Sequence, residues 1–192
     1  LFRGISTSVA SAGGDFDEAI GTVIEGMVQS PRFTYRIEED EGERAQVNGY
    51  DMASRLSYIL WGSSPDKDLY QVAERGGLYD DRMLKDDRAK QRSLEFVSDW
   101  LHLERLENMQ PSTEKFPDWN AELAAAMREE TLIFFNEIVW KKKEPLAALL
   151  NANFSFLTPE LAEHYNVETS LKNGMQRVNF SEGSSRGGLL TQ

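Results

Sequence analysis

The chain has 192 residues, enough for about one domain, and its 32 acidic and 21 basic side chains give a formal net charge of −11. This charge argues against nucleic acid and anionic membrane surfaces as partners, and no apolar run reaches the roughly 18 residues of a membrane-spanning helix. Because cysteine is absent, thiolate catalysis, cysteine-ligated zinc and covalent haem attachment within this chain are excluded. With 40% hydrophobic residues, we expect an acidic globular domain without a cofactor of its own.

Helical periodicity dominates the first 60 residues. Asp15 and Glu18 have the spacing of a capping box at a helix start. The apolar positions of that helix are Phe16, Ile20, Val23 and Met27. The helix should end at Ser30, because a proline follows. The β-prone run 33–37 predicts a short strand, and the apolar spacing of residues 50–61 predicts a second helix.

Two further helical segments are expected in the middle of the chain. Ser64, followed by a proline, has the properties of an N-cap, and the glycines at 76–77 should stop that helix. From about residue 80 to residue 106, the apolar spacing predicts two helices or one bent helix.

The longest helix opens the last third of the chain, with Asp118 or Asn120 as its N-cap. Thr158, followed by a proline, should begin a short helix, and residues 175–180 form the one expected strand in this part. The fold class is therefore mainly α: a compact multi-helix domain of six to eight helices with at most a short β element near the C-terminus.

The glycine-rich run near the end of the sequence suggests a boundary. We interpret residues 1–182 as the helical domain and residues 183–192 as the flexible start of a connection to a following domain. Both ends read as cuts through a longer polypeptide. Leu189 and Leu190 are expected to dock near the long helix, because leaving them in water is unfavourable.

Several motifs in a fixed order resemble one known family. They are SPRFTYRIE (30–38), ASRLSYILW (53–61) with SPD (64–66), EET with FF (129–135), NFSFL (153–157) and LAEHY (161–165). The chain resembles the helical domain of unknown function "fifteen ninety-two", found in large proteins of planctomycetes and related bacteria. The closing RGGLLTQ (186–192) resembles the start of its usual neighbour, the domain of unknown function "fifteen eighty-eight".

This resemblance implies a context rather than a reaction, because the family has no established activity. Such domains sit in exported, periplasmic polypeptides that also carry c-type cytochrome modules and sometimes carbohydrate-binding ones. Haem c would then belong to the neighbouring domains, since this chain lacks cysteine. The partners that the resemblance implies are the other domains of the same polypeptide and, as a further candidate, carbohydrate.

Each of the two histidines follows an acid at helical spacing. Asp99 and His102 stand at i, i+3, and Glu160 and His164 stand at i, i+4. With a glutamate of the long helix, these pairs could hold a metal inside a helical bundle, as in the di-iron carboxylate proteins. Only the first pair has the spacing that those proteins use, so we prefer the interpretation of solvated or capping histidines.

A catalytic carboxylate pair on the long helix, formed by Glu129 or Glu130 with Glu137, is a second candidate site. Glu130 and Glu137 share one helical face, and one of them should be partly buried. A buried acid needs a cation, for which Arg55 and Arg128 are the candidates, and a structural ion pair is the preferred interpretation. In the catalytic alternative, His164 joins the two acids as a general acid or base.

The four tryptophans are candidates for a sugar-binding groove. Trp61 and Trp100 fall on apolar helical faces and are expected in the core. Trp119 and Trp140 flank the long helix and are the better candidates for an exposed surface.

Two functions are compatible with these observations. The preferred hypothesis is a non-catalytic helical scaffold or interaction module of a larger exported, cytochrome-associated protein. The alternative is an enzyme domain whose acidic pocket, formed by Glu130, Glu137 and His164, acts on a polysaccharide or similar substrate. The alternative requires these three side chains to converge in one cleft that solvent can reach.

Overall fold

The computed structural model describes residues 2–35, 47–77, 81–181 and 183–192. The chain divides into two units, Leu1–Met52 and Ala53–Gln192, which are considered separately. The described residues are mostly helical, and their one sheet has two strands near the C-terminus. The predicted fold class, mainly α with a short β element, is therefore confirmed.

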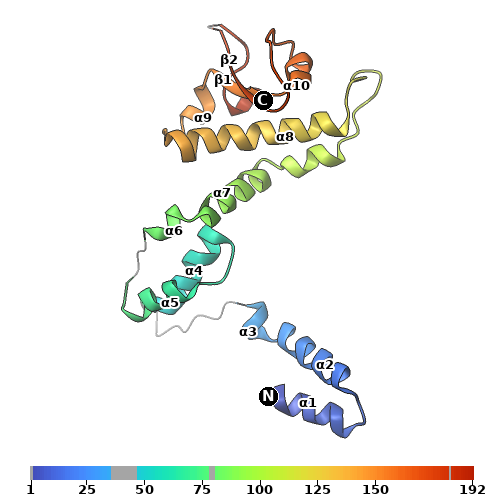
Figure 1. Ribbon diagram of the computed structural model, residues 1–192, viewed down its shortest axis with the longest axis vertical. Helices are drawn as coiled ribbons and strands as arrows, with labels where there is room; N and C mark the ends of the chain where they lie inside the picture. Colours follow the sequence, from blue (N-terminus) through green and yellow to red (C-terminus); the bar gives the residue numbers. More distant parts are fainter. Residues whose placement is uncertain (1, 36–46, 78–80, 182) are drawn as a thin grey trace. The chain divides into compact units, whose positions relative to one another are not determined.

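A helical hairpin forms the first unit. Helices α1 (Phe2–Ser11) and α2 (Phe16–Val28) lie side by side, and the single turn α3 (Pro31–Thr34) follows (Figure 1). The predicted capping box is present, because the Asp15 side chain accepts from the Glu18 N–H at 2.9 Å and the Glu18 carboxylate accepts from the Asp15 N–H at 3.3 Å. The predicted apolar face of α2 is largely exposed at Phe16, Ile20 and Met27.

The expected strand at residues 33–37 is wrong where it can be checked. Residues 33 and 34 belong to α3, in which Pro31 occupies the first turn. Proline suits that position because its fixed φ matches a helix and the first N–H has no helical partner. Residues 36 and 37 lie outside the described residues.

Four short helices begin the second unit. They are α4 (Gly49–Trp61), whose first residues belong to the first unit, α5 (Lys67–Glu74), α6 (Arg82–Lys85) and α7 (Asp87–Trp100). A 3₁₀ helix, η1 (Leu103–Asn108), follows α7. Trp61, Leu69 and Met83 are buried together in one apolar cluster that joins α4, α5 and α6.

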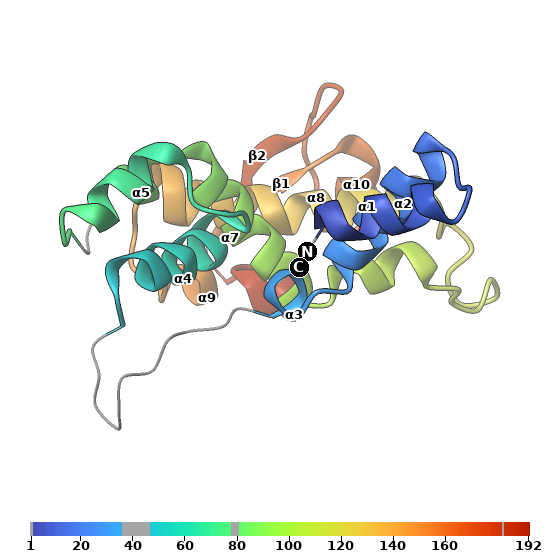
Figure 2. The same ribbon diagram turned by 90° about the horizontal axis from the view of Figure 1, so that it is seen from below.

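Helix α8 (Ala121–Asn136) organises the rest of the second unit and continues as a π-helix, η2 (Glu137–Lys142). Against it lie the elements α9 (Ala148–Asn151), β1 (Phe154–Leu157), α10 (Pro159–His164), β2 (Gln176–Asn179) and the 3₁₀ turn η3 (Leu189–Thr191). The strands are antiparallel, with Phe154 opposite Asn179. Both strands and α10 lie beside α8 (Figure 1, Figure 2).

Two apolar clusters along α8 hold these elements. Leu123 near the start of α8 packs with Leu157 and Leu161, and Phe134 near its end packs with Leu149 and Phe154. Burying each large aliphatic or aromatic side chain contributes about 1.5–3 kcal/mol. The strand β1 was not predicted from the sequence, although it supplies a residue to each cluster.

The helix caps follow the sequence with one correction. Asn120 accepts from the Leu123 N–H at 2.8 Å and Thr158 accepts from the Leu161 N–H at 3.2 Å, as predicted. The cap of α5 is not Ser64, because the Asp66 carboxylate accepts from the Leu69 N–H at 2.9 Å. Serine and aspartate both cap helices well, so the sequence alone could not decide between Ser64 and Asp66.

One of the tryptophan assignments, that of Trp100, is wrong. Trp61 is buried as predicted, but Trp100 is 59% exposed and stacks on Phe96. Trp119 and Trp140 are half-buried, and the Trp140 Nε1–H donates to the Ser93 hydroxyl at 2.7 Å.

Residues 183–192 fold back onto the second unit. Leu189 packs against the cluster around Phe134, as predicted, whereas Leu190 is 80% exposed. The domain boundary expected between residues 182 and 183 concerns a following domain and stays a prediction. Among the described residues, no helix combines the length and the apolar character that crossing a membrane requires.

The corrected caps give a matched pair of variants. Thr158→Ala should lower the free energy of unfolding of the second unit by about 1 kcal/mol, because it removes a cap hydrogen bond. Ser64→Ala should change it by less than about 0.5 kcal/mol. Denaturant unfolding followed by tryptophan fluorescence measures both, since all four tryptophans lie in this unit. Equal losses in the two variants would contradict the assignment.

Candidate functional site

Glu130 is the most unusual polar residue of the second unit. It lies on α8 with only 1% of its surface exposed. The Ser155 hydroxyl of β1 donates to its Oε1 at 2.5 Å, and the Tyr165 hydroxyl at the end of α10 donates to its Oε2 at 3.0 Å. One carboxyl group thus joins α8, β1 and α10.

The last residues of the chain extend this network. The Gln192 Nε2–H donates to the Ser155 hydroxyl at 3.0 Å. The guanidinium of Arg186 lies over the Tyr165 ring, 3.6 Å from its centroid, where a cation is attracted by the ring face. Glu130, Ser155, Tyr165, Arg186 and Gln192 are called the Glu130 network below.

Opposing effects act on the ionisation of Glu130. Burial raises its pKa above the ordinary value of 4.5, while the hydroxyls of Ser155 and Tyr165 and the charge of Arg186 act in the other direction. Burial is the largest effect, so the net shift is upward. Burial also raises the pKa of Tyr165, with the Glu130 carboxylate adding to the shift.

The cation expected beside Glu130 is not the one found. Arg186 takes the role predicted for Arg55 or Arg128, and it acts across the ring of Tyr165 rather than by direct pairing. The guanidinium of Arg128 lies 3.9 Å from the Glu107 carboxylate instead. The expected ion pair of Glu130 is therefore replaced by two hydroxyl donors.

Glu137 has a different environment. It begins the π-helix η2, and its side chain is 16% exposed. Its carboxylate lies 3.2 Å from the Lys141 ammonium and 3.9 Å from the Arg177 guanidinium. Structural ion pairs therefore surround Glu137, as the preferred interpretation of the sequence anticipated.

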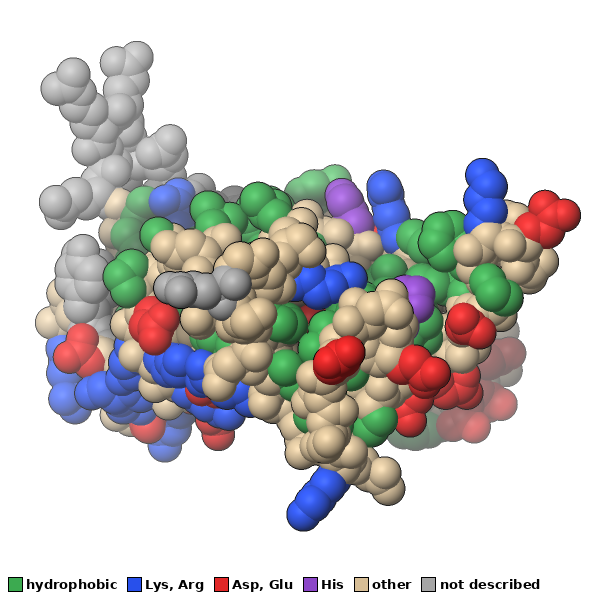
Figure 3. All heavy atoms as spheres, turned by 90° about the horizontal axis from the view of Figure 1, so that it is seen from above, with side chains coloured by type: hydrophobic (Ala, Val, Ile, Leu, Met, Phe, Trp, Pro, Cys, Tyr) green, Lys and Arg blue, Asp and Glu red, His purple; other side chains and the backbone are tan. Residues whose placement is uncertain are grey.

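His164 lines an acidic groove between α8 and α10 with a volume of about 970 Å³. The carboxylates that line it are Asp118, Glu122, Glu129, Glu160 and Glu163. Acidic side chains gather beside α10 in the space-filling view (Figure 3). Neither Glu130 nor Glu137 lines this groove, so the three candidate catalytic residues do not converge in it.

The two acid–histidine pairs differ in outcome. Helix α7 ends at Trp100, and His102 has the left-handed φ of 54°, so Asp99 and His102 do not share a helical face as predicted. The His102 Nδ1 lies 3.4 Å from the Glu104 carboxylate. Glu160 and His164 do share α10 and the groove. Within the described parts of the chain, no three potential ligands are grouped for a metal ion.

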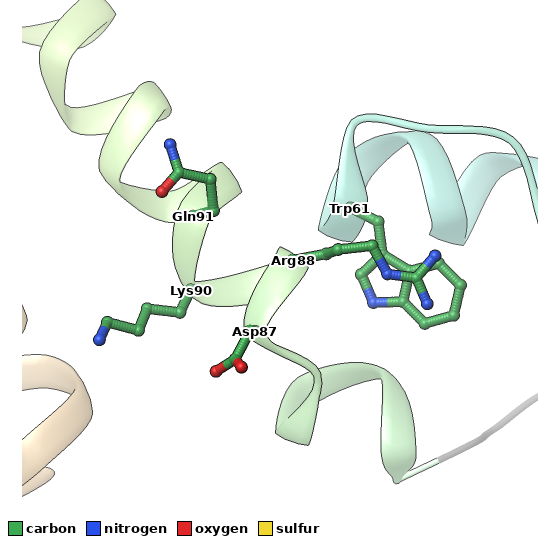
Figure 4. Close-up of a pocket in the computed structure, with 5 residues that line it drawn as sticks. All are labelled: Trp61, Asp87, Arg88, Lys90 and Gln91. Atoms are coloured by element: carbon green, nitrogen blue, oxygen red, sulfur yellow. The ribbon is translucent and has the colours of Figure 1, made fainter.

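Sequence reasoning missed an arginine site in the first half of the second unit. Figure 4 shows the Arg88 side chain lying against the Trp61 ring, and the guanidinium is 3.7 Å from the ring centroid. This guanidinium also donates to the Asp86 carboxylate at 2.7 Å and to the Asp66 carboxylate at 3.1 Å. Asp66 and Asp86 are the N-caps of α5 and α7, so Arg88 links the starts of two helices to the end of α4.

This arginine site, which is called the Arg88 junction below, is structural in character. The adjoining pocket has a volume of about 400 Å³, and Lys90 and Gln91 at its edge extend away from Trp61 (Figure 4). The Trp61 Nε1–H donates to the Met83 carbonyl at 3.0 Å, which adds α6 to the same junction. The Arg88 guanidinium forms ion pairs with both cap carboxylates, so its partners lie within the protein.

A family model described as "Protein of unknown function (DUF1592)" matches residues 47–167. The chain belongs to this family. No curated protein and no solved structure gave a match. The DUF1592 region contains the Arg88 junction and the Glu130, Ser155 and Tyr165 part of the Glu130 network, whereas Arg186 and Gln192 lie beyond it.

The raised pKa of Glu130 predicts a pH dependence. A carboxyl group whose pKa is higher in the folded state stabilises the fold below its ordinary pKa, and this contribution is lost as the pH rises through the folded-state value. The free energy of unfolding of the wild type, relative to Glu130→Gln, should therefore fall as the pH increases from about 4.5. Denaturant unfolding at a series of pH values measures this difference.

Glu129→Gln is the matched control for that series. Its carboxyl group is the neighbour of Glu130 on the same helix, but it is exposed and lines the groove. If the free energy of unfolding of the wild type, relative to that of Glu130→Gln, instead rose with pH, burial would not be the dominant effect on the pKa of Glu130.

The Arg88 junction makes a second pH prediction. Hydrogen bonds from Arg88 lower the pKa of Asp86 to about 2. In Arg88→Gln, the pKa of Asp86 should move back toward its ordinary value of 3.8. NMR titration of the carboxyl carbon measures both values, and an unchanged pKa in the variant would show that the arginine is not the cause.

Proposed function

We propose that this DUF1592 domain is a non-catalytic helical scaffold or interaction module of a larger protein. One observation carries the proposal: Glu130, one of the catalytic candidates from the sequence, is buried and bonded to two hydroxyls inside the domain. A general acid or base must reach the proton that it transfers. A carboxyl group with 1% exposure does not meet that condition, and its position suits a structural role.

The arrangement of the other candidates supports the same proposal. Glu137 is occupied by Lys141 and Arg177, and His164 lies on the exposed end of α10 in a separate groove. Catalytic groups that act together are held in one site by mutual hydrogen bonds. The domain instead distributes these residues over a buried network, an ion-pair cluster and a surface.

The wider context in this proposal follows from the family resemblance. The larger protein is exported to the periplasm of a planctomycete-type bacterium, and haem c resides in its neighbouring domains. A domain of the "fifteen eighty-eight" type continues the chain after residues 183–192. The partners of the scaffold are these domains of the same polypeptide.

The acidic groove favours a second candidate, an enzyme domain that acts on a polysaccharide. Of the expected residues, Glu129 on α8 and His164 on α10 line the groove together with Glu160, whereas Glu130 and Glu137 do not. Glycoside hydrolysis uses two carboxyl groups on opposite sides of the scissile bond. Walls contributed by two helices provide carboxyl groups on both sides of the groove.

A product assay separates the two candidates. The purified chain is incubated with cellulose, chitin, xylan and pectin, and soluble oligosaccharides are measured by mass spectrometry. The scaffold proposal predicts the same background for the wild type and for Glu160→Gln. Oligosaccharide release by the wild type that is lost in a folded Glu160→Gln variant would overturn the scaffold and support the enzyme.

A further inference from the structure

We propose that residues 183–192 form a clasp over the two hydroxyls bound to Glu130, so that the position of this segment and the buried carboxyl group are conformationally coupled. The clasp does not depend on the proposed function. The glycine-rich sequence predicts a flexible segment, whereas the clasp gives residues 183–192 a fixed position on the second unit.

The first arm of the clasp is Arg186. Its guanidinium covers the ring of Tyr165, while the hydroxyl of that ring donates to Glu130. The Arg186 Nη1–H also donates to the Thr191 carbonyl at 3.0 Å. The side chain thus connects the segment's own turn to the edge of the Glu130 network.

The second arm is Gln192. Its amide donates to the Ser155 hydroxyl at 3.0 Å, and Ser155 is 1% exposed. Because the same hydroxyl donates to Glu130, movement of Gln192 changes the hydrogen bonding of the carboxyl group. The Gln192 Oε1 atom is buried without a hydrogen-bond partner, and this unpaired oxygen offsets part of the stabilisation that the second arm provides.

The backbone between the two arms fits closely against α9. Gly188 is buried with a φ of +67°, and a Cβ atom there would run into the carbonyl of Leu150. The Thr191 hydroxyl accepts from the Gly187 N–H at 2.6 Å and closes the turn. Leu189 packs into the cluster around Phe134. The close approach at position 188 requires glycine there, and it holds the segment in place between Arg186 and Gln192.

Gly188→Ala and Gly183→Ala form a matched pair that tests the fit. Both glycines have positive φ, but nothing lies within 4 Å of a Cβ atom at Gly183. Hydrogen exchange followed by mass spectrometry on the full chain should show faster exchange of amides 187–192 in Gly188→Ala by about fivefold or more, and little change in Gly183→Ala. Equal exchange in both variants and the wild type would overturn the clasp.

The coupling to Glu130 is tested by Gln192→Ala and Tyr165→Phe, which each remove one hydrogen bond. Each should accelerate exchange of amides 187–192 by about fivefold, the effect of one typical hydrogen bond. Glu129→Gln, the exposed neighbour, should leave the exchange unchanged. Tyr165→Phe lies outside the clasp and reports the coupling, whereas Gln192→Ala tests the second arm itself and remains informative if Tyr165→Phe perturbs the core. Unchanged exchange in Gln192→Ala, or wild-type exchange as fast as in the exposed loop 110–117, would contradict the proposal.

Discussion

A carboxyl group inside a protein core is unfavourable unless donors surround it, and the arrangement of the DUF1592 domain around α8 follows from this constraint on Glu130. Ser155 and Tyr165 must come close enough to donate, which fixes β1 and the end of α10 against the helix. The apolar clusters on either side of the carboxyl group supply most of the favourable burial, but they are non-directional. The hydrogen bonds select one position for each element, because a shifted strand or helix would leave the acid unpaired.

The Arg88 junction solves a related problem in the first half of the same unit. Helices α5 and α7 each begin with an aspartate cap, and two carboxylates close together repel each other. Arg88 lies between them and rests on the face of Trp61, so one cation pairs with both caps, reduces their repulsion and covers an apolar ring. Both polar sites therefore lie at junctions between secondary-structure elements, and this observation supports the proposal that the domain is a scaffold.

The sequence predicted local features well and long-range contacts poorly. The caps at Asp15 and Thr158 depend on residues at most three positions apart, so their signals are complete in the sequence. The burial of one acid on this helical face was anticipated, but not that it would be Glu130, whose donors come from residues 25 and 35 positions away, where no local pattern identifies them. Trp100 was misplaced because its helix presents two apolar faces, and tertiary packing selects the one containing Val97. The end of α7 before His102 has no glycine or proline signal, which made the expected acid–histidine pair wrong.

A double-mutant cycle between Glu130 and Tyr165 tests the central claim most directly. The free energies of unfolding of the wild type, Glu130→Leu, which has no acceptor, Tyr165→Phe and the double variant give the coupling energy of the pair. If this hydrogen bond helps to fix α10 against α8, the coupling energy should be at least about 1 kcal/mol, as for a hydrogen bond to a charged or buried group. Additive effects of the two substitutions, with a coupling energy near zero, would contradict the account and leave the position of α10 to apolar packing alone.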